Sequence, residues 1–429
     1  MAKHANKFSH LQPVDRPETV AVQVPLPVLG ALANAENAFF ELCVEVGQQV
    51  FSVLMEQDRE ALCGPKGKHD PERRAHRAGS ASSDITLGGR RIPVRRLRAR
   101  SLGGQELALP SFAFATDRDP LDRRTLEAIA CGVSTRKYGR SLEPLGEGRE
   151  ERSTSKSAVS RRFVALSRKQ MTAWLSTPLH DLDLRVLVID GIVFHDHTVL
   201  LVLGIDFDGK KHVLGLREGT TENSRVAKAL LRDLLERGLD PERARVFVLD
   251  GSKALRVAIR KVFGPLSLLH RCQVHKRRNV LDHLPERLHA SVDRVLKEAW
   301  DSTDADLAKR RLEGLASSLE AEHPGAAGSI REGLEETLTL QRLGIQGSLY
   351  RTLRSTNTIE NLNGGVATYT RNVKRWKGGS MIVRWVSAAV LEAQKRFRRI
   401  RGYKEMPRLL AALERVEQEQ ETATDQQVA

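Results

Sequence analysis

The sequence predicts an α/β fold in which a mixed β-sheet core is interrupted by an all-helical block and preceded by a mostly helical region. Between residues 184 and 270, short apolar runs and helical periods follow one another in the order β-β-β-α-β-α-β. Residues 271–350 are then highly charged, helical in pattern and without a good strand. Strands joined first by hairpins and later through helices form a mixed sheet with helices on its faces.

The expected strands are short and apolar, and two of them end in an aspartate followed by glycine. LRVLVID at 184–190 ends in Asp190, and RVFVLD at 245–250 ends in Asp250. The remaining strands are expected at 198–205, 211–216 and 266–270, and the helices at 222–237 and 252–263. RNase H-like domains have this order of elements, and in such sheets functional groups tend to lie at strand ends.

Length and charge limit the possible partners. The chain has 429 residues, so two to four domains are expected, and its formal net charge is +15. A basic protein gains affinity for a polyanion by displacing counterions, which favours nucleic acid as the partner. The sequence lacks an apolar run of roughly 18 residues, and its first residues lack the apolar core of a signal peptide. No membrane association is therefore expected.

The four cysteines are scattered and form no Cys-x-x-Cys pair. A disulfide framework or a structural zinc site is not expected, and a reducing cytoplasm fits best.

Three acidic residues are the candidate catalytic and metal-binding groups. They are Asp190, Asp250 and Glu360, the last within a Thr-Asn-x-x-Glu-Asn segment. Two Mg²⁺ or Mn²⁺ ions that cut a phosphodiester require hard oxygen ligands, which carboxylates supply. For any one aspartate alone, capping a turn or helix is the simpler interpretation.

The region before the sheet is divided into three parts. Residues 1–25 are expected to be disordered or loosely attached, and 26–115 to hold a helix at 28–62 and a basic hairpin at 84–100 that turns at Gly88-Gly89. Residues 116–175 are expected to form three helices, resembling a helix-turn-helix. The third helix carries the candidate DNA-binding residues Lys156, Ser157, Arg161 and Arg162. The alternatives are a solvated hairpin and a plain helical packing unit.

Several longer stretches resemble the catalytic region of Mutator-type bacterial insertion-sequence transposases. They are LVIDGIVF, LGIDFDGKKHVLGLREGTTEN, LLRDLLERGL, VFVLDGSKAL, HRCQVHKRRNVL and STNTIENLN, and the resemblance covers about residues 120–400. It implies a DDE triad at Asp190, Asp250 and Glu360, and a Cys-x-x-His signature at Cys272 and His275. One position departs from the family pattern, because Ala367 stands where an arginine is common; Arg371 and the basic run beyond it are candidates to compensate.

The resemblance also implies how the rest of the chain is organised. An RNase H-like core begins at 181–270, a helical insertion follows at 271–350, and 351–405 completes the core with the glutamate helix and a basic helix. Residues 406–429 are expected to be a charged tail. The N-terminal region is expected to bind terminal inverted repeats.

Two basic segments are further candidates for DNA contact. One surrounds the Cys-x-x-His signature and comprises Arg271, His275, Lys276, Arg277 and Arg278. The other comprises Arg371, Lys374, Arg375 and Lys377, with Trp376 as a possible stacking partner for a distorted base. A solvated basic helix packed by its tryptophans is the alternative for the second segment.

Together these features predict a DDE transposase that binds double-stranded DNA at terminal inverted repeats and at a target. It would nick the ends and join the 3′-hydroxyl to a new phosphodiester with two divalent ions. A homodimer is expected, since two DNA ends must be held together. The protein is expected to act in the cytoplasm at the nucleoid, and no small-molecule substrate is expected. The alternatives are a DNA-binding regulator with a degenerate core and an RNase H-like, structure-selective nuclease.

Overall fold

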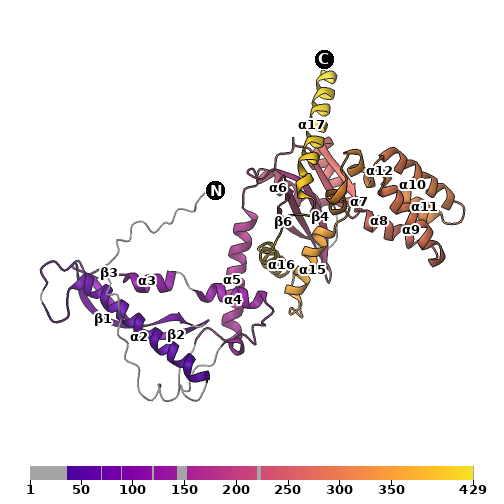
Figure 1. The fold of residues 1–429 in the computed structure, drawn as a ribbon. Helices are drawn as coiled ribbons and strands as arrows, with labels where there is room; N and C mark the ends of the chain where they lie inside the picture. The colour runs from indigo at the N-terminus through magenta and orange to yellow at the C-terminus, as the bar shows by residue number, and fades with distance from the viewer. Residues whose placement is uncertain are drawn as a thin grey trace. The chain divides into compact units, whose positions relative to one another are not determined.

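The computed structural model describes residues 36–68, 70–87, 89–117, 120–142, 152–219 and 224–428. The chain divides into two compact units, Met1–Phe163 and Val164–Ala429, which are considered separately (Figure 1). The segment 1–25, expected to be disordered or loosely attached, lies outside the described residues.

In the first unit, a long helix packs on a β-hairpin. The helix is α2 (Glu36–Cys63), and the strands are β1 (Ala75–Leu87), β2 (Arg90–Ser101) and the short β3 (Glu106–Leu107), followed by α3 (Pro110–Asp117). Met55, Ala75, Ala99 and Leu109 form part of its buried core. The predicted hairpin is confirmed but is longer than 84–100. Leu87 pairs with Arg90, as a two-residue turn requires, although Gly88 lies outside the described residues.

The prediction of three helices within 116–175 is wrong in its middle element. Helices α4 (Pro120–Ala130) and α5 (Lys156–Leu175) form, but the described residues between them contain turns and a single 3₁₀ turn, η1 (Gly139–Ser141). Gly132 adopts a φ of +92°, which ends α4. The buried Tyr138 then donates a hydrogen bond to the Gly89 carbonyl at 2.9 Å, which holds the segment against the hairpin.

The second unit is built on a five-stranded mixed sheet. Its strands in chain order are β4 (Leu184–Phe194), β5 (His197–Asp206), β6 (Lys211–Gly219), β7 (Arg245–Leu249) and β8 (Ser267–Arg271). Their spatial order is β6-β5-β4-β7-β8; β4, β5 and β6 are antiparallel, and β7 and β8 run parallel to β4. The α/β prediction is confirmed, with every predicted strand present.

Alternating side chains give this sheet two buried faces. Leu187, Ile189 and Phe247 pack against α6 (Ser224–Glu236) and α7 (Lys253–Phe263). Val186, Val188, Val246 and Val248 point to the opposite face. Buried residues from the helices of the last part of the chain cover that face: α14 (Gly347–Leu353), α15 (Asn357–Thr370), α16 (Gly379–Gln394) and α17 (Met406–Val428).

Only helices form between β8 and α14. They are α8 (Gln273–Leu281), α9 (Glu286–Trp300), α10 (Ala305–Leu319), α11 (Pro324–Arg331) and the short α12 (Leu334–Thr337) and α13 (Thr339–Arg342). Except for α13, whose Leu340 is buried in the core of the sheet, they share an apolar core of their own that includes Val280, Trp300, Leu312 and Ile330. Figure 1 shows them gathered beside one end of the sheet. We call this bundle, residues 273–342, the helical insertion.

The prediction of a charged tail at 406–429 is wrong for its first half. Met406, Leu409 and Leu413 of α17 are buried in the same core as the sheet. The prediction failed because polar residues dominate the segment's composition and hide three apolar residues at helical spacing. The second half of α17 extends away from the sheet (Figure 1). No helix among the described residues is long and apolar enough to cross a membrane.

Candidate active site

Strand register brings two of the predicted carboxylates together. Val186, Leu187 and Val188 of β4 pair with Val246, Phe247 and Val248 of β7 in parallel. Continuing this register by two residues sets Asp190 beside Asp250, on the face to which Val188 and Val248 point. The prediction that Asp190 ends its strand is wrong, because β4 stays paired with β5 up to Phe194. It lies where β4 loses its β7 neighbour, since β7 ends at Leu249.

Helix α15 supplies the third carboxylate. Ile359, Leu362 and Val366 are buried in the core against the sheet, which fixes the rotation of the helix about its axis. Glu360 and Asn363, three residues apart, therefore lie on a common side of α15. Asn363 Nδ2 donates a hydrogen bond to Asp190 Oδ2 at 2.7 Å, so this side of the helix meets the aspartates.

The three carboxylates influence one another electrostatically. Burial first, and then the charges of Asp250 and Glu360, raise the pKa of Asp190 to about 6, against the opposing effects of the Gly191 N–H and His275. A carboxyl group that is buried beside like charges requires a positive partner to remain ionised. Positive charge at this site would therefore stabilise the ionised form of Asp190.

Thr356 connects Glu360 to the Cys-x-x-His signature. Its side chain is fully buried, and its hydroxyl donates to Glu360 Oε1 at 2.6 Å. Thr356 Oγ1 also lies 3.4 Å from Cys272 Sγ and 3.3 Å from His275 Nδ1. Because a hydroxyl has one proton, Glu360 and Cys272 compete for it as acceptors, and the shorter distance favours Glu360.

His275 itself faces the carboxylates. Its Nδ1 lies 3.9 Å from Glu360 Oε1. Hydrogen bonding with Cys272 raises the pKa of His275 above its usual value, and the charges of Glu360 and Asp250 act in the same direction. Cys272 is buried beneath it, so the signature pair lies at the site.

The residues present have the donor chemistry that Mg²⁺ or Mn²⁺ prefers. Three carboxylates supply hard oxygen ligands, and Asn363 Oδ1 is a buried oxygen without a hydrogen-bond partner in the described part of the chain. Within the same residues, no three His, Cys, Asp or Glu side chains are already grouped closely enough to hold one ion. A shared ion would therefore have to draw these carboxylates closer together.

Two of the predicted DNA contacts are buried cations that bind the helical insertion instead. Arg271 donates to the Glu332 carbonyl at 2.9 Å and pairs with the Glu332 carboxylate at 3.3 Å. Lys276 is 1% exposed, and its Nζ donates to the carbonyls of Ser329 and Glu332. Burial lowers the pKa of Lys276 to about 8. The sequence displays their charge but not their burial, which explains the misassignment.

The other two cations of this segment differ from each other. Arg277 is half-buried and pairs with Asp293, whereas Arg278 is exposed. In the segment 271–278, His275 lies near the carboxylates and Arg278 lies at the surface. These two are the predicted contacts of this segment that remain available to DNA.

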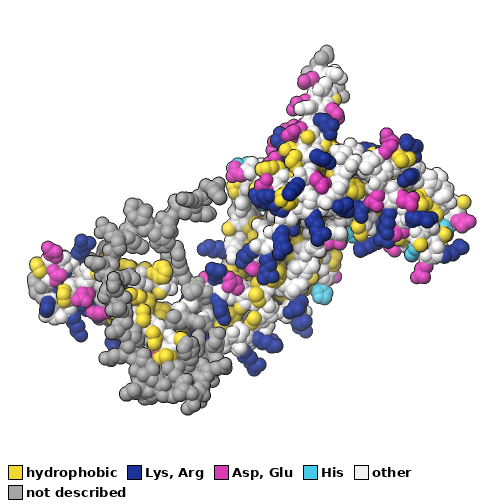
Figure 2. All heavy atoms as spheres, viewed as in Figure 1, with side chains coloured by type: hydrophobic (Ala, Val, Ile, Leu, Met, Phe, Trp, Pro, Cys, Tyr) yellow, Lys and Arg dark blue, Asp and Glu magenta, His cyan; other side chains and the backbone are white. Residues whose placement is uncertain are grey.

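The second predicted basic segment is exposed. Arg371, Lys374, Arg375 and Lys377 all have exposed side chains, and they follow α15 directly. Figure 2 shows Lys and Arg side chains spread over the visible face of the second unit. Trp376 packs edge-on against Phe194, with ring centroids 5.1 Å apart, so it is an internal anchor rather than an exposed stacking platform. Since Phe194 lies four residues beyond Asp190 on β4, this contact holds the basic segment on the face of the sheet that bears the carboxylates.

In the first unit, α5 presents most of its predicted contacts to solvent. Lys156, Ser157 and Arg161 are exposed. The Arg162 guanidinium pairs with Asp122 at 3.3 Å and donates to the Ser153 carbonyl, so it joins α5 to α4.

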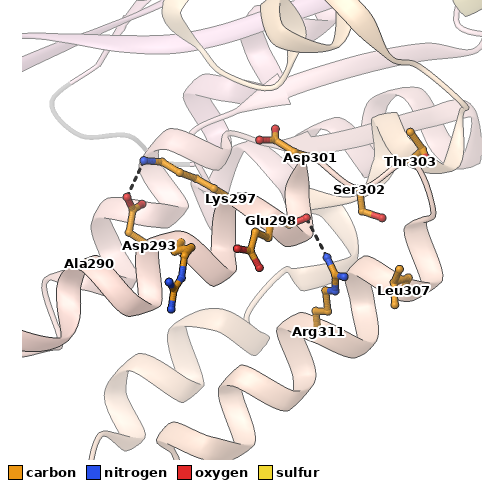
Figure 3. A pocket seen from close by; sticks show the side chains of 10 residues that line it. Ala290, Asp293, Lys297, Glu298, Asp301, Ser302, Thr303, Leu307 and Arg311 are labelled. Atoms are coloured by element: carbon orange, nitrogen blue, oxygen red, sulfur yellow. Dashed lines mark hydrogen bonds and ion pairs between the residues drawn. The ribbon is translucent and has the colours of Figure 1, made fainter.

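An open hollow of about 830 Å³ lies in the helical insertion, away from the carboxylates. Part of its charged lining is paired internally: Lys297 binds Asp293 at 2.7 Å, and Arg311 donates to the Glu298 carbonyl (Figure 3). The hollow is therefore a groove between packed helices and adds nothing to the carboxylate site.

Sequence reasoning missed Asn363 and Thr356 as parts of the site. Both lie in the segment that contains Glu360, at spacings of three and four residues from it. Helical spacing alone could have placed them on the side of Glu360. Their contacts depend on the sheet and on Cys272, which sequence spacing does not reveal.

Comparison with known proteins extends the match over most of the chain. The model of the family "Transposase, Mutator family" matches residues 31–399. A transposase of insertion sequence element ISRM5 from Rhizobium meliloti is 29% identical over 320 residues, which are 70% of this chain and 74% of the relative. The IS6120 transposase of Mycolicibacterium smegmatis is 30% identical over 47% of this chain and 62% of its own length. The IS256 transposase of Tn4001 from Staphylococcus aureus is 27% identical over 61% of this chain and 66% of its own length.

Proposed function

Because the chain belongs to the Mutator family of transposases, we propose that it cuts DNA at the ends of an insertion sequence and joins the freed 3′-hydroxyl to a new phosphodiester. Asp190, Asp250 and Glu360 are the catalytic carboxylates of an RNase H-like core. The observation that supports this proposal is their proximity: two neighbouring parallel strands and one covering helix bring Asp250 and Glu360 close enough for their charges to raise the pKa of Asp190.

Two Mg²⁺ or Mn²⁺ ions, held by these three residues, would supply a nucleophile at neutral pH and stabilise the leaving oxygen. The protein's own part is to hold its groups in position. Thr356 restrains Glu360, Asn363 restrains Asp190, and the His275 ring lies beside Glu360. Catalysis then consists mainly of positioning and charge stabilisation.

DNA is the substrate that the surface charge supports. The exposed cations after α15, Arg371, Lys374, Arg375 and Lys377, would bind phosphates next to the carboxylates. In the first unit, Lys156, Ser157 and Arg161 of α5 are the proposed contacts to terminal inverted repeats. A homodimer that acts in the nucleoid and holds two DNA ends completes the proposal.

The decisive experiment replaces the three acids singly, as Asp190→Asn, Asp250→Asn and Glu360→Gln. DNA taken from either side of the coding sequence serves as the substrate, with Mg²⁺ or Mn²⁺ present. Each variant should lose strand cleavage by about 1000-fold or more, since several kcal/mol of charge stabilisation disappear. Asp196→Asn, in the exposed turn between β4 and β5, is the matched control and should cleave normally.

DNA affinity, measured by mobility shift in EDTA, should change little in all four variants. Cleavage that persists in any of the three site variants would remove that residue from the mechanism.

A pre-nicked end separates the transposase from its two rivals. A transposase should join that 3′-hydroxyl to a second duplex, whereas a structure-selective nuclease would only hydrolyse DNA. A regulator with a degenerate core would bind the duplex but neither nick nor join it.

A further inference from the structure

A second polar residue of α15 contacts the carboxylate site. Asn363 lies three residues after Glu360, and its Nδ2 reaches Asp190 Oδ2 at 2.7 Å. The carboxylate can only accept a hydrogen bond, so the amide nitrogen must be the atom that faces it. A bond of this length to an ionised acceptor is stronger than one between neutral groups.

The packing of α15 leaves Asn363 little freedom. Leu362 and Val366, on either side of it in sequence, are buried against the sheet. Asn361, by contrast, is exposed on the outer side of the same helix. The chain therefore offers two asparagines two residues apart, one directed to Asp190 and one to solvent.

Asn363 is a neutral partner for Asp190. Asp190 lies beside Asp250 on one face of the sheet, and Glu360 shares the side of α15 that carries Asn363. An arginine or lysine in place of Asn363 would neutralise the carboxylate and compete with any cation that binds there. An amide N–H fixes the orientation of the carboxylate without adding charge.

The other end of the amide is also informative. Asn363 Oδ1 is buried and has no hydrogen-bond partner among the residues that the structure describes. A buried oxygen of this kind is costly, and in native proteins such atoms need an explanation. Its position beside Asp190 leaves an uncharged oxygen available at the same site.

We propose that Asn363 is a positioning residue that orients Asp190 for divalent-cation binding. This inference rests on the proposed function, because it assumes that Asp190 is a metal ligand. Groups that orient metal ligands typically contribute 10- to 100-fold to metal affinity or activity. Asn363→Ala should therefore weaken Mn²⁺ binding by about 10-fold, whereas Asn361→Ala should leave it unchanged.

The test measures Mn²⁺ binding without relying on catalysis. A ligand that binds the folded protein raises its melting temperature in proportion to RT ln(1 + [L]/Kd). The full chain and its variants are heated across a Mn²⁺ series, and the ion concentration that gives a fixed rise is compared. Asn363→Ala should need about 10-fold more Mn²⁺ for that rise, even if its metal-free melting temperature is lower.

Two further variants separate the possible failures. If Asp190→Asn responds to Mn²⁺ as the unchanged chain does, the proposed function fails at its metal site. If Asp190→Asn loses the response but Asn363→Ala matches Asn361→Ala, only the role of Asn363 is overturned. In the double variant, Asn363→Ala should add no further loss to Asp190→Asn, because it acts through that carboxylate.

Discussion

Single side chains decide whether the acidic residues of this site can work together. Asp190 accepts a hydrogen bond from the Asn363 amide, and Glu360 accepts one from the Thr356 hydroxyl. Asn363 lies in α15, and Thr356 immediately precedes that helix. Thr356 is the more constrained of the two donors, since Cys272 Sγ and His275 Nδ1 also lie within hydrogen-bonding distance of its hydroxyl oxygen. The Cys-x-x-His signature thus acts on Glu360 through Thr356.

Replacing Thr356 tests this chain of contacts. Thr356→Val keeps the side-chain volume but removes the hydroxyl, so Glu360 loses its donor, and cleavage should fall by about 10-fold or more. Thr356→Ser keeps the hydroxyl and should retain most of the activity. The comparison uses cleavage rates at saturating Mg²⁺, and equal rates for the two variants would show that the hydroxyl is dispensable.

At the scale of elements, the strands were the most predictable part of the fold. Runs such as RVFVL are short, apolar and bounded by polar residues, which is how buried strands are encoded. The helix expected after Gly132 did not form, because Tyr138 is buried by a hairpin distant in sequence. The burial of Lys276 likewise depends on the helical insertion, and the partners of Asn363 depend on how α15 meets β4. Local sequence carries none of these long-range contacts.

The loop after β7 is another element shaped by such a contact. Gly251, directly after Asp250, has a φ of +112°, and a Cβ there would lie 2.5 Å from Arg271 Nε. The same Arg271 guanidinium approaches Gly333 of the insertion, where a Cβ would lie 2.9 Å from Nη1. Two glycines therefore leave the space that this buried cation fills.

Gly251→Ala should lower the unfolding free energy by more than the positive φ alone accounts for, because the added Cβ would also collide with the Arg271 guanidinium. Gly344→Ala is the matched control, since Gly344 also has a positive φ, of +69°, but an added Cβ there meets nothing within 4 Å. The control should cost about 1–2 kcal/mol, and Gly251→Ala should cost more and also reduce cleavage, because Asp250 is adjacent. Equal losses of unfolding free energy in urea would contradict the role given to Arg271.

At the scale of the whole molecule, the second unit depends on its last helix. Beyond the apolar contacts of α17, Glu417 pairs with Arg185 at 3.2 Å and accepts a hydrogen bond from the Ala244 N–H at 2.7 Å. The side chain of Arg185 is only 1% exposed, and it lies at the start of β4. Glu417 thus shares with Asp183, 2.7 Å from the same guanidinium, the balancing of a buried charge in the strand that carries Asp190.

Glu417→Ala should therefore lower the unfolding free energy by about 2 kcal/mol, since a buried cation loses one of its two acidic partners and the Ala244 N–H loses its acceptor. Glu419→Ala, on the exposed side of α17, should change it by less than about 0.5 kcal/mol. Urea denaturation of both variants provides the comparison. A similar, small effect of the two substitutions would mean that α17 is held by apolar contacts alone.

The separation of the acids along the chain has a consequence for protein synthesis. Asp190 and Asp250 leave the ribosome well before Glu360, which follows the entire helical insertion, and α15 is supported by helices that are made later still. If the three acids form the catalytic set proposed above, a polypeptide that ends before Glu360 has two of them and cannot cut DNA. Products truncated within the helical insertion would then occupy DNA without breaking it.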